Sequence, residues 1–133
     1  MLKQLSIYAE NKKGALQVMT NALYEAGINI WGSVTNDGAE YGINRMVVSD
    51  PDKAKEVLTE KGYLCRFVDV LAVEIEDKPG ALNTLLTALL DSNVNVDYTY
   101  LSFNRDSSTP VMILHTADPE EVEICLKAKG FKM

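Results

Sequence analysis

Two short stretches of the chain combine a glycine with residues that could bind an anion. They are Glu10-Asn11-Lys12-Lys13-Gly14-Ala15-Leu16 and Glu76-Asp77-Lys78-Pro79-Gly80-Ala81-Leu82. Each precedes a segment with helical apolar spacing, so each glycine is expected at a helix start, where it lets another group approach the backbone closely. The first N–H groups of a helix have no partner within it, and the helix dipole favours an anion there. A carboxylate suits this position, although a glycine that only permits a tight turn is the alternative.

Two asparagines follow these stretches at equal spacing. Asn29 and Asn95 come 18 residues after Asn11 and Asp77, at the start of the next expected strand. A side-chain amide offers a donor and an acceptor, so it could hold both the ammonium and the carboxylate of a free amino acid. Because a helix joins the two strands, we expect their facing ends to lie close together. A turn-forming asparagine without a ligand is the alternative.

Both features belong to an internal repeat. Residues 11–30 align without a gap on residues 77–96, with seven identical pairs among twenty. The offset is 66 residues there and 68 residues where 50–62 matches 118–130. We therefore expect two small domains, 1–68 and 69–133, with two extra residues in a loop of the second.

Apolar spacing predicts the same order of elements in both copies. In the first copy, strands are expected at 5–9, 28–34, 43–49 and 63–67, helices at 16–26 and 51–61, and a turn at Asn36-Asp37-Gly38. In the second copy, strands are expected at 70–75, 94–103 and 111–115, helices at 80–91 and 119–129, and at most a stub of the last strand. Gly27 and Gly62 are expected to end the helices before them. This order predicts an α+β fold of two ferredoxin-like βαββαβ repeats, with the helices on one face of antiparallel sheets.

Composition, charge and missing motifs exclude several classes of partner and site. The net charge of −6 and the pI near 4.7 argue against nucleic-acid and anionic-membrane partners, and no apolar run reaches transmembrane length. We expect no secretory signal, and we expect Cys65 and Cys125 to be reduced thiols of a cytoplasmic protein. His115, the single histidine, has no ligand-spaced partner, so neither a metal site nor a cofactor is expected. No hydrolase, P-loop or zinc-protease motif is present.

The repeated motif resembles a known family. N-K-K-G-A-L followed by A-G-I-N-I, within a βαββαβ order, resembles the ACT domain, and D-K-P-G-A-L followed by S-N-V-N-V resembles it more closely still. The resemblance covers essentially the whole chain, as a tandem pair without an attached catalytic domain. ACT domains most often bind amino acids and regulate enzymes of amino-acid metabolism. In phosphoglycerate dehydrogenase two such domains pair side by side, with the effector at the seam, and the resemblance implies the same arrangement here.

The resemblance also implies ligand-binding residues. In the first repeat they are Asn11, Lys12, Lys13, Gly14, Ala15, Leu16, Asn29 and Ile30, and in the second Asp77, Lys78, Pro79, Gly80, Ala81, Leu82, Asn95 and Val96. The dehydrogenase has a histidine two residues before the turn asparagine, where this chain has Ala9 or Ile75. Asp77 replaces an asparagine and would repel a carboxylate. We therefore expect the first repeat to bind the ligand.

These observations predict a non-catalytic regulator that binds a free amino acid and acts as a homodimer or on a metabolic enzyme in trans. An apolar lining from Leu16, Ile28, Ile30 and Val96 would suit a branched or aromatic side chain. One alternative is a regulatory subunit that works through protein contacts alone, without a small-molecule ligand. Another is a small enzyme, which the lack of a base–nucleophile pair disfavours.

Overall fold

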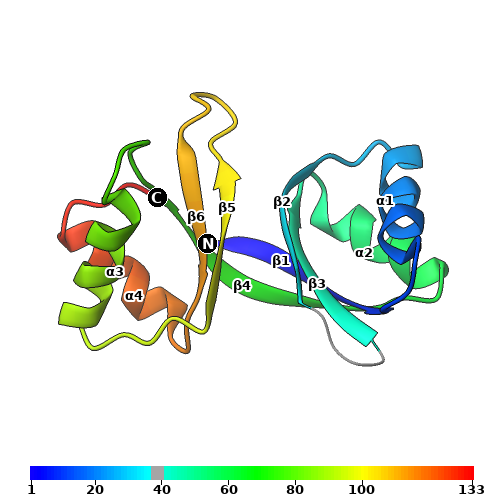
Figure 1. The fold of residues 1–133 in the computed structure, drawn as a ribbon, viewed down its shortest axis with the longest axis horizontal. Helices are drawn as coiled ribbons and strands as arrows, with labels where there is room; N and C mark the ends of the chain where they lie inside the picture. Colours follow the sequence, from blue (N-terminus) through cyan, green and yellow to red (C-terminus); the bar gives the residue numbers. More distant parts are fainter. Residues whose placement is uncertain (37–40) are drawn as a thin grey trace. The chain divides into compact units, whose positions relative to one another are not determined.

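The computed structural model describes residues 1–36 and 41–133 (Figure 1). Its elements, in chain order, are β1 (Leu2–Glu10), α1 (Ala15–Glu25), β2 (Ile30–Asn36), β3 (Tyr41–Val48), α2 (Pro51–Glu60), β4 (Leu64–Glu74), α3 (Ala81–Asp91), β5 (Tyr98–Phe103), β6 (Pro110–His115) and α4 (Pro119–Ala128). No helix among the described residues is long and apolar enough to span a bilayer.

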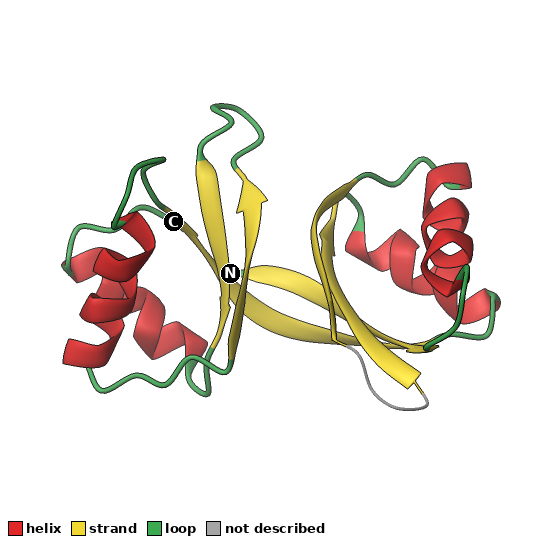
Figure 2. Cartoon of the chain, in the orientation of Figure 1, coloured by secondary structure: helices red, strands yellow, loops and turns green. Residues whose placement is uncertain are grey.

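The chain forms two compact units, which we call the first repeat (Lys3–Val68) and the second repeat (Asp69–Met133, joined by Met1–Leu2). The strands are hydrogen-bonded in the antiparallel order β2-β3-β1-β4-β6-β5, and β4 runs from one repeat into the other. Within each repeat, both helices cover one face of the strands (Figure 2). The predicted α+β class with two ferredoxin-like repeats is therefore confirmed.

Each repeat has an apolar core between its helices and strands. In the first, fully buried Leu5 and Ile7 of β1 pack with Met19 and Leu23 of α1 and with Leu58 of α2. The second core uses the counterpart side chains Leu71, Val73, Leu85, Leu89 and Leu126, together with Leu114, the counterpart of Met46 in the first core. Because the core-facing side chains recur every second residue in the strands and every three or four in the helices, these cores hold each helix over its own strands.

The last expected strand of the second repeat is reduced to a short segment without strand structure. The chain beyond α4 is not a strand, yet the Glu74 amide donates to the Lys132 carbonyl at 2.8 Å. Phe131 and Met133 pack against the second core. This short segment therefore covers the position that β4 of the first repeat fills with a full strand.

Several boundaries differ from those predicted. The strand expected from Val94 begins only at Tyr98. The Val94 amide donates to the Leu89 carbonyl at the end of α3, as the Ile28 amide does to the Leu23 carbonyl in the first repeat, where the strand expected from Ile28 begins at Ile30. The Asn95 side chain donates to Asp97, whose amide in turn donates to the His115 carbonyl of β6. The expected turn at Asn36-Asp37-Gly38 lies largely outside the described residues.

The register shows where the two extra residues entered. Ser33 pairs with Met46 in the first repeat, and Thr99 pairs with Leu114 in the second. The offset between the copies therefore rises from 66 to 68 between the second and third strands of each repeat. The insertion lies in the loop between β5 and β6, as a loop insertion was predicted to.

The starts of α2 and α4 provide a matched test of capping. Asp50 Oδ1 accepts a hydrogen bond from the Lys53 amide at 3.2 Å, whereas its counterpart Asp118 makes no side-chain cap bond in the described structure. Asp50→Ala is expected to lower the free energy of unfolding by about 1 kcal/mol, and Asp118→Ala by much less. Urea denaturation measures both. Equal losses would contradict this account of the two caps.

Candidate functional site

The turn between β1 and α1, residues Glu10–Leu16, is called the first corner. Gly14 stands at its centre with φ of +84°, and α1 follows directly. The Lys12 amide donates to the Glu10 carbonyl and the Ala15 amide to the Lys12 carbonyl, each at 3.1 Å. The left-handed backbone, which glycine adopts without strain, thus turns the chain from strand to helix in a few residues.

Free amides remain at this helix start. No side chain caps α1, and its first turn carries no acidic residue. Within the described part of the chain, no hydrogen-bond partner is present for the amides of Lys13, Gly14, Leu16 and Gln17. Such amides, at the positive end of the helix dipole, favour an anion. The Lys12 amide, which the resemblance placed among the ligand contacts, is already engaged.

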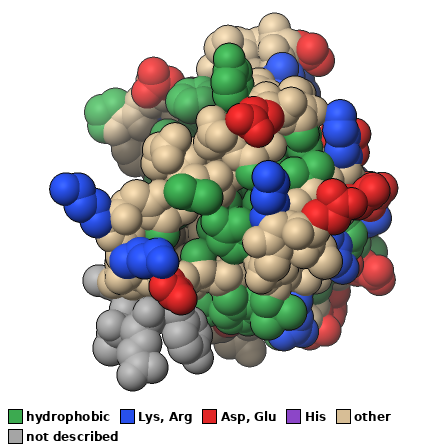
Figure 3. Space-filling model, turned by 90° about the vertical axis from the view of Figure 1, so that its right-hand side faces the viewer, with side chains coloured by type: hydrophobic (Ala, Val, Ile, Leu, Met, Phe, Trp, Pro, Cys, Tyr) green, Lys and Arg blue, Asp and Glu red, His purple; other side chains and the backbone are tan. Residues whose placement is uncertain are grey.

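The space in front of the corner is open. A Cβ added to Gly14 would meet no atom within 4 Å, so the positive φ, and not crowding, accounts for glycine at this position. Figure 3 views the molecule from the side on which α1 and α2 lie in Figure 1, and apolar side chains gather there among charged ones. The exposed apolar side chains of α1 include Leu16, Val18 and Tyr24. A small molecule can therefore reach the corner backbone.

Two cavities flank the first corner. One, of about 460 Å³, lies between the corner and the start of β4, where Gly62 and Tyr63 line it. The other, of about 290 Å³, lies between the corner and the β2–β3 strands. Glu10, Lys12, Gly14, Ala15 and Gln17 line both cavities. Lys13 lines the larger and Asn11 and Leu16 the smaller, so the cavities together include every corner residue that the sequence singled out.

The smaller cavity has a polar wall that the motif did not indicate. Asn44 of β3 is only 4% exposed and lines this cavity. Its Nδ2 donates to Thr35 Oγ1 at 2.6 Å and to Ser33 Oγ at 3.2 Å. The sequence does contain a signal, because Asn44 precedes Met46 and Val48 at strand spacing and therefore shares their core-facing side.

The second corner, residues Glu76–Leu82, has the same backbone. Gly80 has φ of +86°, and the amides of Lys78 and Ala81 donate to the carbonyls of Glu76 and Lys78. A cavity of about 270 Å³ adjoins it, and all its lining residues are counterparts of residues lining the larger first-repeat cavity. The two corners are thus the same turn, with less space beside the second.

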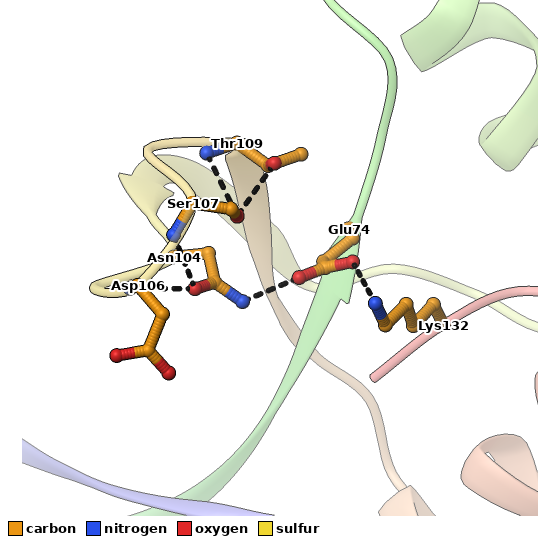
Figure 4. A network of polar contacts seen from close by, with 6 residues as sticks. All are labelled: Glu74, Asn104, Asp106, Ser107, Thr109 and Lys132. Atoms are coloured by element: carbon orange, nitrogen blue, oxygen red, sulfur yellow. Dashed lines mark hydrogen bonds and ion pairs between the residues drawn. The ribbon is translucent and has the colours of Figure 1, made fainter.

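The chemistry around the second corner is different. Glu74 replaces Tyr8 in the cavity lining, and its carboxylate lies between Asn104 Nδ2, which donates to it, and the Lys132 ammonium, 3.6 Å away (Figure 4). Asn104 Oδ1 also accepts from the Asp106 and Ser107 amides, so Glu74 anchors the β5–β6 loop. This carboxylate is therefore engaged in holding the loop and the chain end, a role that Tyr8 cannot take in the first repeat.

The polar wall is also absent from the second repeat. By strand register, Leu101 and Met112 occupy the positions that Thr35 and Asn44 hold in the first repeat. Met112 accordingly belongs to the second core. The polar cavity is therefore particular to the first corner among the described residues.

The two asparagines do not join the corners within their own repeats. Asn29 follows α1 at its far end, about 16 Å along the helix from Gly14. It lines, with Ile30, an open hollow beside Tyr24 that excludes the corner. The expectation that the facing strand ends meet is wrong, because the helix runs back along the sheet between them. Whether a ligand bridges the two repeats stays a prediction.

The remaining predicted residues lie as follows. Asn95 lines a separate cavity at the far end of α3, while Lys78 and Ala81 line the second-corner cavity. The residues that line none of the cavities described here are Asp77, Pro79, Gly80, Leu82 and Val96. The apolar lining expected from Ile28, Ile30 and Val96 is likewise not found at the corners.

The side chains that could take part in catalysis or bind a metal make structural contacts or are buried. His115 Nδ1 lies 2.9 Å from Asp97 Oδ2, and its ring stacks on Tyr98 at 4.9 Å. Burial raises the pKa of the Cys65 thiol, with Lys55 opposing the shift, so this thiol is poorly nucleophilic at neutral pH. Among the described residues, no group of three or more His, Cys, Asp or Glu could hold a metal ion.

The backbone at the first corner can be tested directly. Gly14→Ala is expected to lower the free energy of unfolding by about 1 to 2 kcal/mol, because an alanine at positive φ is strained. Gly14→Asn should cost less, since asparagine tolerates this region better. Chemical denaturation of the two variants provides the comparison. If alanine costs no more than asparagine, the left-handed turn is not what requires glycine here.

Comparisons with known proteins agree on one family. The family described as ACT domain pair matches residues 1–131. Protein BT0572 from Bacteroides thetaiotaomicron, which has a crystal structure, is 31% identical, with 98% of this chain and 90% of that chain covered and a TM-score of 0.89. No curated protein sequence matches the chain.

More distant structures share the fold. The ligand-free regulatory subunit of aspartate kinase from Thermus thermophilus is 14% identical, with 95% of this chain and 91% of that chain covered and a TM-score of 0.65. The regulatory subunit of aspartate kinase from Thermus flavus is 19% identical, with 96% and 91% covered and a TM-score of 0.62. Both are similar to this chain over nearly its whole length.

Proposed function

Because the chain belongs to the ACT domain pair family, we propose that it is a non-catalytic regulatory protein that binds a free amino acid at the first corner and modulates amino-acid metabolism. The observation that carries this proposal is the set of unpartnered amides at the start of α1, beside two cavities. Cavities of about 460 and 290 Å³ are large enough for a free amino acid.

The corner offers complementary groups to both ends of a zwitterion. Its free amides and the helix dipole would receive the α-carboxylate. Glu10, which lines both cavities, supplies a carboxylate for the α-ammonium, although Lys12 Nζ lies 3.1 Å from it and competes. The side chain would enter either the larger cavity near Tyr63 or the smaller one against Asn44.

Asymmetry between the repeats supports the first corner as the site. At the second, Asp77 replaces Asn11 and Pro79 replaces Lys13, so the corner is more negative, and the adjoining cavity is smaller. Both differences disfavour the α-carboxylate, so we propose one dominant site per chain.

Regulation would follow from differential binding. A ligand shifts the conformational equilibrium toward the state that binds it more tightly. The free energy of this shift cannot exceed the difference between the ligand's binding free energies for the two states. The solved structures that share this fold include two aspartate kinase regulatory subunits, which supports an output to an enzyme of amino-acid metabolism in trans. The end strands β2 and β5 each have one hydrogen-bonded neighbour in the strand order, so they also offer an edge to a second copy in the cytoplasm.

The test is a thermal-shift screen of the twenty amino acids at millimolar concentration, followed by calorimetry with any hit. Leu16→Glu is the informative variant, because Leu16 is 46% exposed and lines the smaller cavity. A carboxylate in the first turn of α1 should leave the helix as stable or more so, yet repel the ligand's carboxylate. Ligand affinity is expected to fall at least about tenfold.

Leu82→Glu, the same change in the second repeat, is the matched control and should retain binding. If no amino acid raises the melting temperature of the native protein, the rival function, a subunit that acts through protein contacts alone, is favoured. If the two variants lose affinity equally, the ligand does not select the first corner.

A further inference from the structure

The far ends of α1 and α3 differ in how their last carbonyls are satisfied. In the first repeat, Lys53 of α2 extends to the end of α1, where its ammonium donates to the Ala26 carbonyl at 2.9 Å. A cation at this position suits the negative end of the helix dipole. The first repeat thus carries its own ammonium group here.

The second repeat has the opposite charge at the same place. Ser92 is the counterpart of Ala26 at the end of α3, and Glu121 of α4 is the counterpart of Lys53. A carboxylate therefore stands where an ammonium would be favourable. The helix end and the side chain beside it are therefore both negative.

A second contact of the first repeat, a hydrogen bond to a serine side chain, is also missing from the second. In the first repeat, Ser49 Oγ accepts from the Asn29 amide and the Ser49 amide donates to the Asn29 carbonyl, both at 2.9 Å. Ala117 replaces Ser49 in the second repeat, so this side-chain bond cannot form. Asn95, the counterpart of Asn29, donates to Asp97 instead.

A cavity of about 500 Å³ opens where these groups are lost, and we call it the acidic cavity. Its lining includes three carboxylates, from Asp97, Asp118 and Glu121, and no lysine or arginine. Asp97 already faces His115, 2.9 Å away, whereas no hydrogen bond or ion pair engages the Asp118 and Glu121 carboxylates within the described chain. The cavity therefore offers two uncommitted carboxylates beside a helix C-terminus.

Thr116 gives an independent indication of a missing hydrogen-bond partner. It lines the acidic cavity, is 2% exposed, and its hydroxyl has no hydrogen-bond partner among the described residues. A buried hydroxyl without a partner costs free energy, because it has left water without a replacement. A ligand ammonium that reaches the Thr116 hydroxyl would supply a hydrogen-bond partner.

We propose that the acidic cavity binds the primary ammonium group of a small amine, which takes the place that Lys53 fills in the first repeat. The ligand class is a free alkylamine with one apolar arm, such as a diamine or a basic amino acid. The carboxylates are not gathered as metal ligands, since no group of three His, Cys, Asp or Glu in the described chain could hold a metal ion. The site lies about 16 Å from Gly80 along α3, so it is separate from the corner.

The first experiment is a proton–nitrogen NMR titration of the whole protein with cadaverine. Amide shifts are expected at residues 92–97 and 116–125, and not at the first corner. L-Lysine added in place of cadaverine distinguishes an amino-acid source from a diamine source, and pentanol, which lacks the charge, should cause no shift there. Absence of shifts up to about 10 mM cadaverine would overturn the proposal.

Charge reversal at Glu121 then tests the mechanism. Glu121→Lys recreates the first repeat's ammonium and should weaken cadaverine binding at least about tenfold, while keeping or raising the melting temperature. Glu120→Lys makes the same change on the same helix, but Glu120 does not line the cavity, so binding should change little. Should Glu121→Lys fail to fold, Glu121→Gln tests the same loss of charge.

Equal effects of the two lysine variants would mean that cadaverine responds only to overall charge, and would overturn the site. Magnesium chloride is the remaining control. Shifts in the same residues with magnesium, abolished by Glu121→Lys, would overturn the assignment to an alkylammonium. Because Leu16→Glu leaves this cavity intact, failure of the amine site and failure of the amino-acid site are distinguishable.

Discussion

The structure depends on a left-handed glycine placed directly before a helix. Gly14 and Gly80 both have φ values near +85°, and each lets a strand turn into a helix without a capping side chain. The turn leaves amides at the helix start without partners, and such amides must be satisfied by water or by a ligand. The same constraint that makes the turn therefore also makes the candidate binding site.

Duplication of this turn does not duplicate its surroundings. Around the first corner, Asn44 and Thr35 form a polar wall, whereas Met112 and Leu101 occupy the same register in the second repeat. At the far helix ends the difference is one of charge, because Lys53 faces a carbonyl in one repeat and Glu121 stands at that place in the other. Two copies of one fold thus present distinct chemistry, and each repeat serves as an internal control for the other.

Much of the fold could be predicted from local patterns. The glycines, the Asp-Pro helix starts and the apolar spacing located all four helices, since these features depend on neighbours along the chain. The late start of β5 was not predictable, because Val94 and Val96 alternate with polar residues as in a strand yet lie in the connection between α3 and β5. The glycine turns were found from their motif, but the expected closeness of Asn29 to the corner of its own repeat was wrong, because a helix carries Asn29 to the opposite end of that repeat. Asn44 was missed because a single polar residue in a strand is informative only once its face is known.

The central claim is that the free amides at the start of α1 receive the carboxylate of an amino acid. The most direct measurement is the chemical-shift change of the Gly14, Leu16 and Gln17 amides in a spectrum recorded with the bound ligand. The account predicts that these three amides shift strongly, as expected when a charged acceptor replaces water. A bound amino acid that leaves them unmoved while other amides shift would contradict it.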